Sequence, residues 1–140
     1  MLQILIFYPL MAMAALTFGV GILMIRLRFL AVRRGEINPR HFLLNRGSKV
    51  PDYLTKVEQN YQNLLELPLL FYTISILLLL TNKVDLIYLS LAWSYVGMRL
   101  LHTLIHTTVN KLRMRMWAFL VSSLILIAIW LRLLLQLATL

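Results

Sequence analysis

Four long apolar stretches follow one another along the chain, and polar or charged segments separate them. We place these stretches at residues 2–25, 54–80, 86–109 and 116–138. A helix of about 20 apolar residues crosses the hydrocarbon core of a bilayer. The pattern therefore predicts an all-α membrane protein, with one domain over residues 1–140 built as a bundle of four transmembrane helices.

Local signals refine these elements. Pro51 precedes Asp52, whose carboxylate is favourable at the positive end of a helix, so we expect the second helix to begin there. Further along, Pro68 cannot donate to the carbonyl of Leu64, which loosens that helix locally. The connection at 26–51 is rich in glycine and proline and is expected to be a loop with a short helix around 40–44. The first stretch carries small residues at a spacing that lets another helix approach closely, namely Ala12, Ala15 and Gly19.

Composition supports a membrane protein and removes several chemistries. The chain is 61% hydrophobic, well above the share in soluble domains. It has no cysteine, which excludes disulfides, thiol nucleophiles and cysteine-bound metals. The formal charge of +9 would indicate nucleic acid in a soluble protein. Here the placement of the charge favours membrane topology, and we expect no nucleic-acid partner.

The basic residues predict an orientation. Eight lie between Arg26 and Lys56, three lie in the turn at 110–115, and Lys83 alone lies in the turn at 82–85. Basic loops stay in the cytoplasm, so we expect both termini on the non-cytoplasmic face. Most of these cations are expected to set the topology and to contact anionic lipid.

Two predicted helices carry polar stripes. In the second helix the stripe has spacings of three and four and consists of Lys56, Gln59, Asn63 and Glu66. In the third helix the corresponding residues are Tyr95, Arg99, His102, His106, Asn110 and Arg113. Ionisable groups in a membrane avoid lipid, and they either hydrogen-bond helices together or line a wet cavity. We favour a cavity that opens to the cytoplasm, in which Glu66 and Arg99 form an ion pair or share a ligand.

A metal is a weaker interpretation of the same residues. His102 and His106 are one helical turn apart, and Glu66 offers a carboxylate. The chain contains only three histidines, whereas membrane di-iron enzymes need many more. No bound metal is expected.

The chain resembles the MAPEG family, the membrane-associated proteins of eicosanoid and glutathione metabolism. The segment ValGluGlnAsnTyrGlnAsnLeuLeuGluLeuPro at 57–68 looks like the second-helix signature of that family, with the AsnxxGlu core at Asn63 and Glu66. The four-helix plan with basic loops and the stripe that ends at Arg113 also match. The resemblance implies a homotrimer with one glutathione site at each subunit interface. We expect a bacterial branch of the family, located in the inner membrane.

The resemblance also implies roles for individual residues. The side chains predicted to bind glutathione are Asn63, Glu66, Gln59, Arg99, His102 and Arg40. Gln59 stands where the family usually has an arginine. His102 and His106 stand where its glutathione transferases carry tyrosines. Arg113 is predicted to stabilise the glutathione thiolate, because a nearby cation lowers a thiol pKa, and His106 to act as acid or base.

These inferences predict a glutathione transferase or peroxidase that uses glutathione as co-substrate. Its lipophilic partner would be an electrophile or a lipid hydroperoxide from the bilayer. Two alternatives stay open. One is a small proton-coupled transporter that relies on a buried Glu66. The other is a non-catalytic trimeric membrane scaffold.

Overall fold

The computed structural model describes residues 2–47 and 49–139, and these residues form helices and connections without any strand. The helices are α1 (Leu2–Leu5), α2 (Phe7–Arg33), α3 (His41–Leu44), α4 (Asp52–Glu66), α5 (Pro68–Leu80), α6 (Leu86–Thr107) and α7 (Leu112–Ala138). The all-α prediction is confirmed for this part of the chain.

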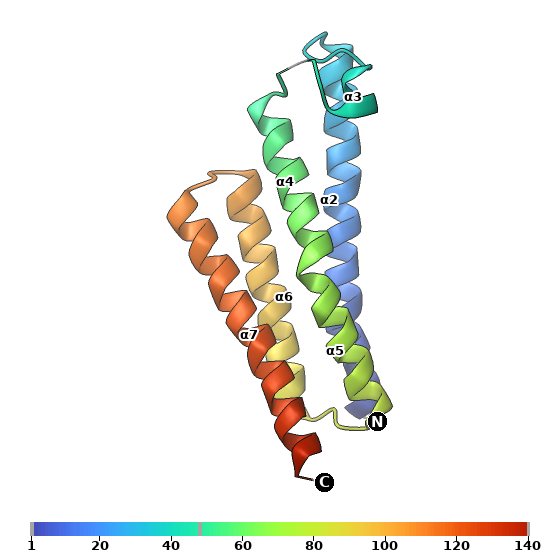
Figure 1. Cartoon of the computed structure of the whole chain (residues 1–140), viewed down its shortest axis with the longest axis vertical. Helices are drawn as coiled ribbons and strands as arrows, with labels where there is room; N and C mark the ends of the chain where they lie inside the picture. The colour runs from blue at the N-terminus through green and yellow to red at the C-terminus, as the bar shows by residue number, and fades with distance from the viewer. Residues whose placement is uncertain (1, 48, 140) are drawn as a thin grey trace.

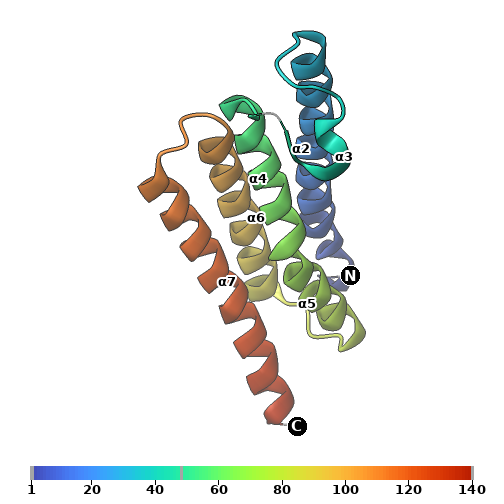
Figure 2. The same cartoon turned by 45° about the horizontal axis from the view of Figure 1, so that its top comes forward.

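The long helices run roughly side by side (Figure 1). The most extensive contacts join α6 to α7 and α2 to α4, and α4 also contacts α6. Both termini lie at one end of the molecule, together with the turn between α5 and α6 (Figure 1). The two basic connections, at 34–51 and 108–111, lie at the opposite end (Figures 1 and 2). Their shared location agrees with the alternating path that the sequence predicts.

Three helical stretches are long and apolar enough to cross a membrane, namely Leu2–Arg33, Asp52–Leu80 and Leu112–Ala138. This fits a multi-pass membrane protein. Helix α6 has 22 residues and is about 33 Å long, which matches a bilayer core, but it is not among the three. The reason is the polar stripe, since an arginine and two histidines within its last nine residues lower its mean hydropathy.

Several helix boundaries agree with the sequence signals, and others extend beyond them. Helix α4 begins at Asp52, and α5 begins at Pro68 after a break at Leu67. Helix α2 continues past residue 25 to Arg33, and α7 already begins at Leu112. Arginine is a good helix former, so these helices continue beyond the apolar stretches that a bilayer core requires.

A continuous apolar core runs along the bundle between α2, α4–α5, α6 and α7. A second, smaller cluster of Ala31, Ile37 and Leu54 fixes the long connection against the ends of α2 and α4. Helix α4 packs tightly on α2 at Gly21, where an added Cβ would lie 3.0 Å from Cε2 of Tyr61. Gly19, which the sequence favoured for a close helix contact, has nothing within 4 Å of its Cβ position. The two glycines point about 200° apart on α2, so α4 does not approach the face that the small-residue spacing indicated at Gly19.

Two ion pairs tie distant segments together. Arg28 donates from Nε to Oε1 of Glu58 at 2.8 Å and so joins α2 to α4. At the other end, Arg132 donates to both carboxylate oxygens of Asp85, at 2.8 and 2.6 Å. Asp85 also caps α6 by accepting from the backbone N–H of Tyr88. The hydrogen bonds from Arg132 lower the pKa of Asp85 to about 2.

Replacing Gly21 with leucine is expected to destabilise the protein by about 1–3 kcal/mol, because the side chain would displace Tyr61 and separate α2 from α4. Gly19→Leu, two residues away in open space, is the matched control and should cost far less. Thermal unfolding in detergent measures both. Equal losses in the two variants would contradict this packing.

The Asp85–Arg132 pair predicts a defined pH dependence. Because folding lowers the pKa of Asp85, the stabilisation is fully present above the ordinary aspartate pKa of about 3.9 and is lost as the pH falls through about 2. Asp85→Asn keeps the helix cap and removes the charge. The wild type should therefore melt above Asp85→Asn at neutral pH, and the difference should vanish at low pH. A difference that is independent of pH would rule out the ion pair as its cause.

Candidate functional site

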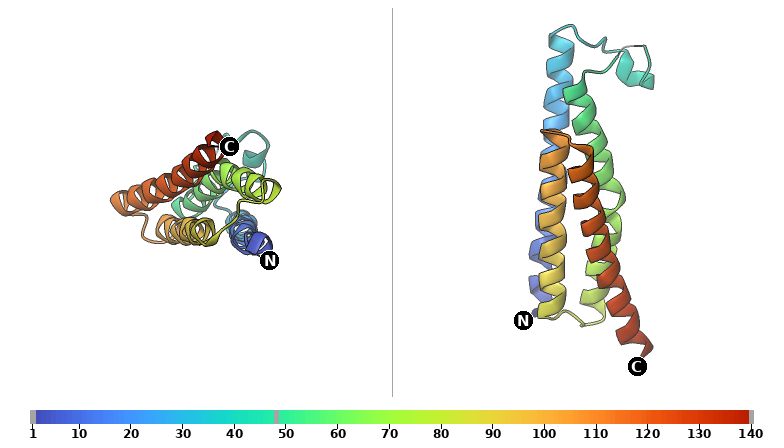
Figure 3. Two further views of the ribbon diagram at one scale, coloured as in Figure 1. Left: turned by 90° about the horizontal axis from the view of Figure 1, so that it is seen from below. Right: turned by 90° about the vertical axis from the view of Figure 1, so that its left-hand side faces the viewer.

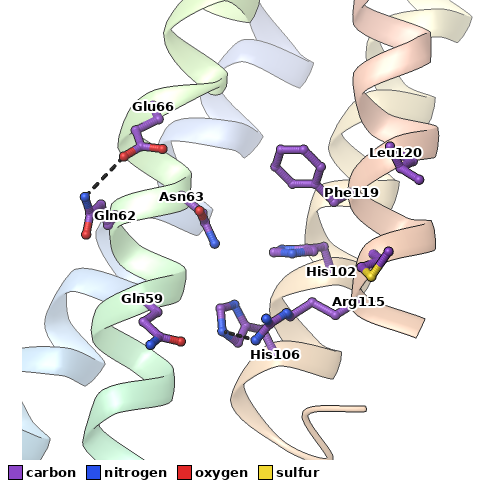
Figure 4. A pocket seen from close by; sticks show the side chains of 10 residues that line it. Gln59, Gln62, Asn63, Glu66, His102, His106, Arg115, Phe119 and Leu120 are labelled. Carbon is purple, nitrogen blue, oxygen red and sulfur yellow. Dashed lines mark hydrogen bonds between the residues drawn. The ribbon is translucent and has the colours of Figure 1, made fainter. Parts of the chain in front are cut away.

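A cleft of about 510 Å³ lies between α4 and the α6–α7 hairpin, towards the end that carries the basic connections (Figure 4). It exists because α7 packs against α5 at one end of the bundle and diverges from α4 at the other (Figure 1). The view from below also shows α7 at the side of the bundle (Figure 3). The lining residues are Gln59, Gln62, Asn63 and Glu66 of α4, His102 and His106 of α6, and Arg115, Met116, Phe119 and Leu120 of α7.

Helix α4 gives the cleft an amide-rich wall. Its lining residues share one helical face, while Leu54, Val57 and Leu64 on another face are buried in the bundle. Glu66 accepts a hydrogen bond from Nε2 of Gln62 at 3.2 Å (Figure 4). The sequence analysis expected Glu66 deep inside the bundle. Its side chain is instead exposed, because the stripe of α4 faces the open cleft and not a neighbouring helix.

Helix α6 supplies two buried histidines. The rings of His102 and His106 lie edge to face with their centroids 5.5 Å apart. Nε2 of His106 lies 2.9 Å from Nη1 of Arg115. A guanidinium only donates hydrogen bonds, so this nitrogen accepts and the neutral ring carries its proton on Nδ1. The buried Nδ1 atoms of both histidines have no hydrogen-bond partner among the described residues.

Arg115 is the cation of the cleft, and the sequence analysis missed it. Its Nη1 donates both to His106 and to Oδ1 of Asn110, at 2.9 Å each. Figure 4 shows its side chain extending from α7 towards the His106 ring. Two acceptors on the preceding helix and turn thus fix the guanidinium at the mouth of the cleft. The sequence signal that could have identified Arg115 is a basic residue at the start of a helix, close to a polar turn.

Arg113, predicted to be catalytic, is exposed and does not line the cleft. The prediction continued the spacing of α6 through the turn. That turn breaks the helical phase, since Asn110 adopts a left-handed conformation with φ of 48° before α7 begins. On α7, Arg113 and Arg115 point about 200° apart, so only one of them can face α4.

Arg99 lies behind the cleft and does not line it. It is fully buried, its Nε donates to the hydroxyl of Tyr95 at 3.2 Å, and its Cζ lies 5.0 Å from the Phe119 ring centroid. Its Nη1 and Nη2 find no acceptor in the described chain. The ion pair with Glu66 that the sequence allowed is not formed. The described ion pairs are Arg28–Glu58 and Arg132–Asp85.

Two further residues, Arg40 and Asn60, differ from the sequence prediction. Arg40 is exposed just before α3 and does not line the cleft. Asn60 was not predicted, yet it is fully buried and exchanges hydrogen bonds with Thr103 of α6 at 3.3 and 3.4 Å. It lies one position off the polar stripe of α4, on the side that packs against α6. This pair holds α4 and α6 together directly beside the histidines.

The chemistry of the cleft suits a polar ligand with several kinds of group. Three side-chain amides, one carboxylate, one guanidinium and two imidazoles line it or face it. Such a set can bind peptide groups, an ammonium and an anion at the same time. Among residues 2–47 and 49–139, no group of three or more histidine, aspartate or glutamate side chains is placed to hold a metal ion.

Comparison with known proteins gives one result. No curated protein and no solved structure matches the chain. The model of the MAPEG family matches residues 6–135, which is nearly the whole length. The chain therefore belongs to the MAPEG family.

Proposed function

We propose that this protein is a membrane enzyme that binds glutathione in the cleft between α4 and the α6–α7 hairpin and transfers its thiolate to a lipophilic acceptor. The observation that carries the proposal is the guanidinium of Arg115, held by two acceptors at the mouth of a cleft whose opposite wall carries amides and Glu66. Membership of a family named for eicosanoid and glutathione metabolism supports the same chemistry.

The ligand fits the cleft group by group. Glutathione is a tripeptide with one ammonium, two carboxylates and a thiol. Glu66 is the acceptor for the ammonium, and Asn63 with Gln59 bonds the peptide groups. His102 and His106 line the same cleft, beside the guanidinium of Arg115 that His106 holds. The basic connections at this end of the molecule raise the local concentration of an anionic substrate.

Arg115 is the group best located to stabilise the thiolate, in the role that the sequence analysis gave to Arg113. A cation beside a thiol favours the ionised form, which is the nucleophile. The thiolate sulfur attacks an electrophilic carbon, a carbon–sulfur bond forms, and the leaving group departs with its electron pair. With a hydroperoxide, the sulfur attacks the terminal oxygen, the O–O bond breaks, and the alkoxide that leaves takes up a proton and becomes an alcohol. A second glutathione then reduces the sulfenic product and yields a disulfide and water.

We extend the proposal to topology and assembly. Helix α6 is taken as a fourth membrane span, whose polar face is sheltered by α4 and α7. The basic connections lie in the cytoplasm of a bacterial cell and both termini on the other side of the inner membrane. The chain forms a homotrimer, and a neighbouring subunit covers the open side of the cleft. The exposure of Glu66 in the cleft supports this closure, because ionisable groups in a membrane avoid lipid.

The transporter alternative has less support. It requires a carboxylate that is sheltered in the bundle and for which protons and substrate compete. Glu66 accepts a hydrogen bond from Gln62 and lies in a cleft that also contains a guanidinium and two imidazoles. The guanidinium and imidazoles that face it suit an anion better than a cationic drug.

Titration with glutathione tests the proposal directly. The ultraviolet difference spectrum of the bound thiolate should develop with a thiol pKa lowered from about 8.5 to about 7, because Arg115 stabilises the anion. Arg115→Gln should abolish the thiolate signal, whereas Arg113→Gln, two residues away on the exposed side of α7, should retain it. Loss in Arg113→Gln alone would reverse the assignment. Failure of the wild type to bind millimolar glutathione would leave the scaffold as the better interpretation.

The role of His106 in holding Arg115 gives a second test. In His106→Gln the amide oxygen still accepts a hydrogen bond from the guanidinium, whereas His106→Leu removes the acceptor. We expect His106→Leu to reduce kcat with a model electrophile by about 10–100-fold and His106→Gln to keep most of it. If both variants lose activity equally, His106 acts as acid or base itself and not by positioning Arg115.

A further inference from the structure

We propose that the cytoplasmic end of α2 and the connection at 34–47 together form a binding site for an anionic phospholipid. The site combines an apolar groove for an acyl chain, two exposed leucines and a cluster of cations that form no ion pair in the described part of the chain. It lies on a different part of the molecule from the cleft and does not depend on the proposed reaction.

The groove is preformed and mainly apolar. It has a volume of about 380 Å³ and is lined by Ile25, Arg28, Phe29, Val32, Pro39 and Phe42. Helix α2 forms one wall, and the returning connection forms the other. The guanidinium of Arg28 joins the two, because it lies 5.2 Å from the Phe42 ring centroid and also bonds Glu58. The walls are therefore held in place without a ligand.

The groove lies at the depth of lipid headgroups. The 27 residues of α2 span about 40 Å, whereas the hydrocarbon core is about 30 Å thick. Its first charged residue is Arg26, so the turns from there to Arg33 extend beyond the core. The connection then returns from the end of α2 to the start of α4 (Figure 1), and within it the Phe42 ring of α3 lies against the Arg28 guanidinium of α2. Burial of Ile37 against Ala31 and Leu54 fixes this return.

Helix α3 presents apolar side chains outward from this position. Leu43 is 79% exposed and Leu44 is 75% exposed. Two adjacent leucines facing water next to an apolar groove are unfavourable. Insertion into the boundary between headgroups and acyl chains removes that cost, as it does for interfacial helices.

Six exposed cations lie in this segment and form no ion pair among residues 2–47 and 49–139. They are Arg26, Arg33, Arg34, Arg40, Arg46 and Lys49. Two carboxylates of the region are engaged elsewhere, since Glu58 pairs with Arg28 and Glu36 accepts from the Tyr53 hydroxyl. Clusters of four to eight basic residues next to a membrane helix attract anionic lipid.

The combination of groups selects the occupant. A soluble anion would satisfy the arginines and leave Leu43 and Leu44 in water. A second copy of this segment would bring the same positive charge. A phospholipid with a net negative charge satisfies both requirements, since the phosphate meets the cations and an acyl chain fills the groove.

The charge requirement is tested with the purified protein in phosphatidylcholine nanodiscs, with and without phosphatidylglycerol. Added phosphatidylglycerol should raise the melting temperature of the wild type, and native mass spectrometry should detect retained phosphatidylglycerol. Arg33→Gln/Arg46→Gln should lower the affinity for that lipid about fivefold for each arginine lost. Lys83→Gln, at the opposite end of the bundle, is the matched control and should behave as the wild type. Equal retention of both lipids by the wild type would overturn the proposal.

The depth requirement is tested separately. Because the chain has no cysteine, Leu43→Cys provides a single attachment point for a spin label. Its accessibility to oxygen and to a water-soluble nickel complex should place the label in the headgroup region when phosphatidylglycerol is present. A label at Lys111→Cys, in the other basic connection, should remain in water. If the Leu43 label is aqueous in both lipids, the site is not at the membrane. Strong dipolar broadening between labels would instead assign the groove to a contact between subunits.

Discussion

Helix α6 carries Arg99, His102 and His106 along one face of a mainly apolar protein, and sheltering these groups constrains everything around them. A charge or imidazole that faced acyl chains would cost several kcal/mol. The bundle avoids this cost by packing α6 between α4 and α7, with the Asn60–Thr103 pair as a polar tie and the rings of Tyr95 and Phe119 against the Arg99 guanidinium. Among the described residues, buried nitrogens of Arg99, His102 and His106 have no hydrogen-bond partner, and of these three residues the two histidines line the cleft.

The cleft follows from how the helices are joined. A short turn links α6 to α7, so the two helices stay together, while α7 reaches α5 only at the far end. The break at Leu67 and Pro68 separates the polar helix α4 from the apolar helix α5. The amide side chains of α4 therefore lie opposite the histidines, and the apolar helix α5 packs against α7. The polar lining of the cleft and the apolar contact between α5 and α7 thus lie at different ends of the bundle.

The two ends of the bundle also differ in charge, and both the cleft and the apolar groove lie towards the basic end. Eleven of the fourteen Lys and Arg residues lie at one end, in the segments 26–56 and 111–115, whereas at the other end Asp85 and Arg132 neutralise each other. The glutathione and the anionic lipid that we propose as ligands would both be attracted to the basic end. They would bind to different surfaces there, because the groove lies between α2 and the connection after it, whereas the cleft lies between α4 and the α6–α7 hairpin.

The sequence by itself determined the helical class, the start of α4, the break at Pro68 and the two polar stripes. Each of these depends on neighbours within one helix, where spacing fixes direction. It correctly grouped Gln59, Asn63, Glu66, His102 and His106, which line one cleft. Only the tertiary structure decided which cation joins them. The left-handed turn at Asn110 resets the helical phase, so Arg115 faces the cleft and Arg113 does not. The exposure of Glu66 and the isolation of Arg99 likewise depend on how far α7 diverges from α4, which no periodicity within a single helix encodes.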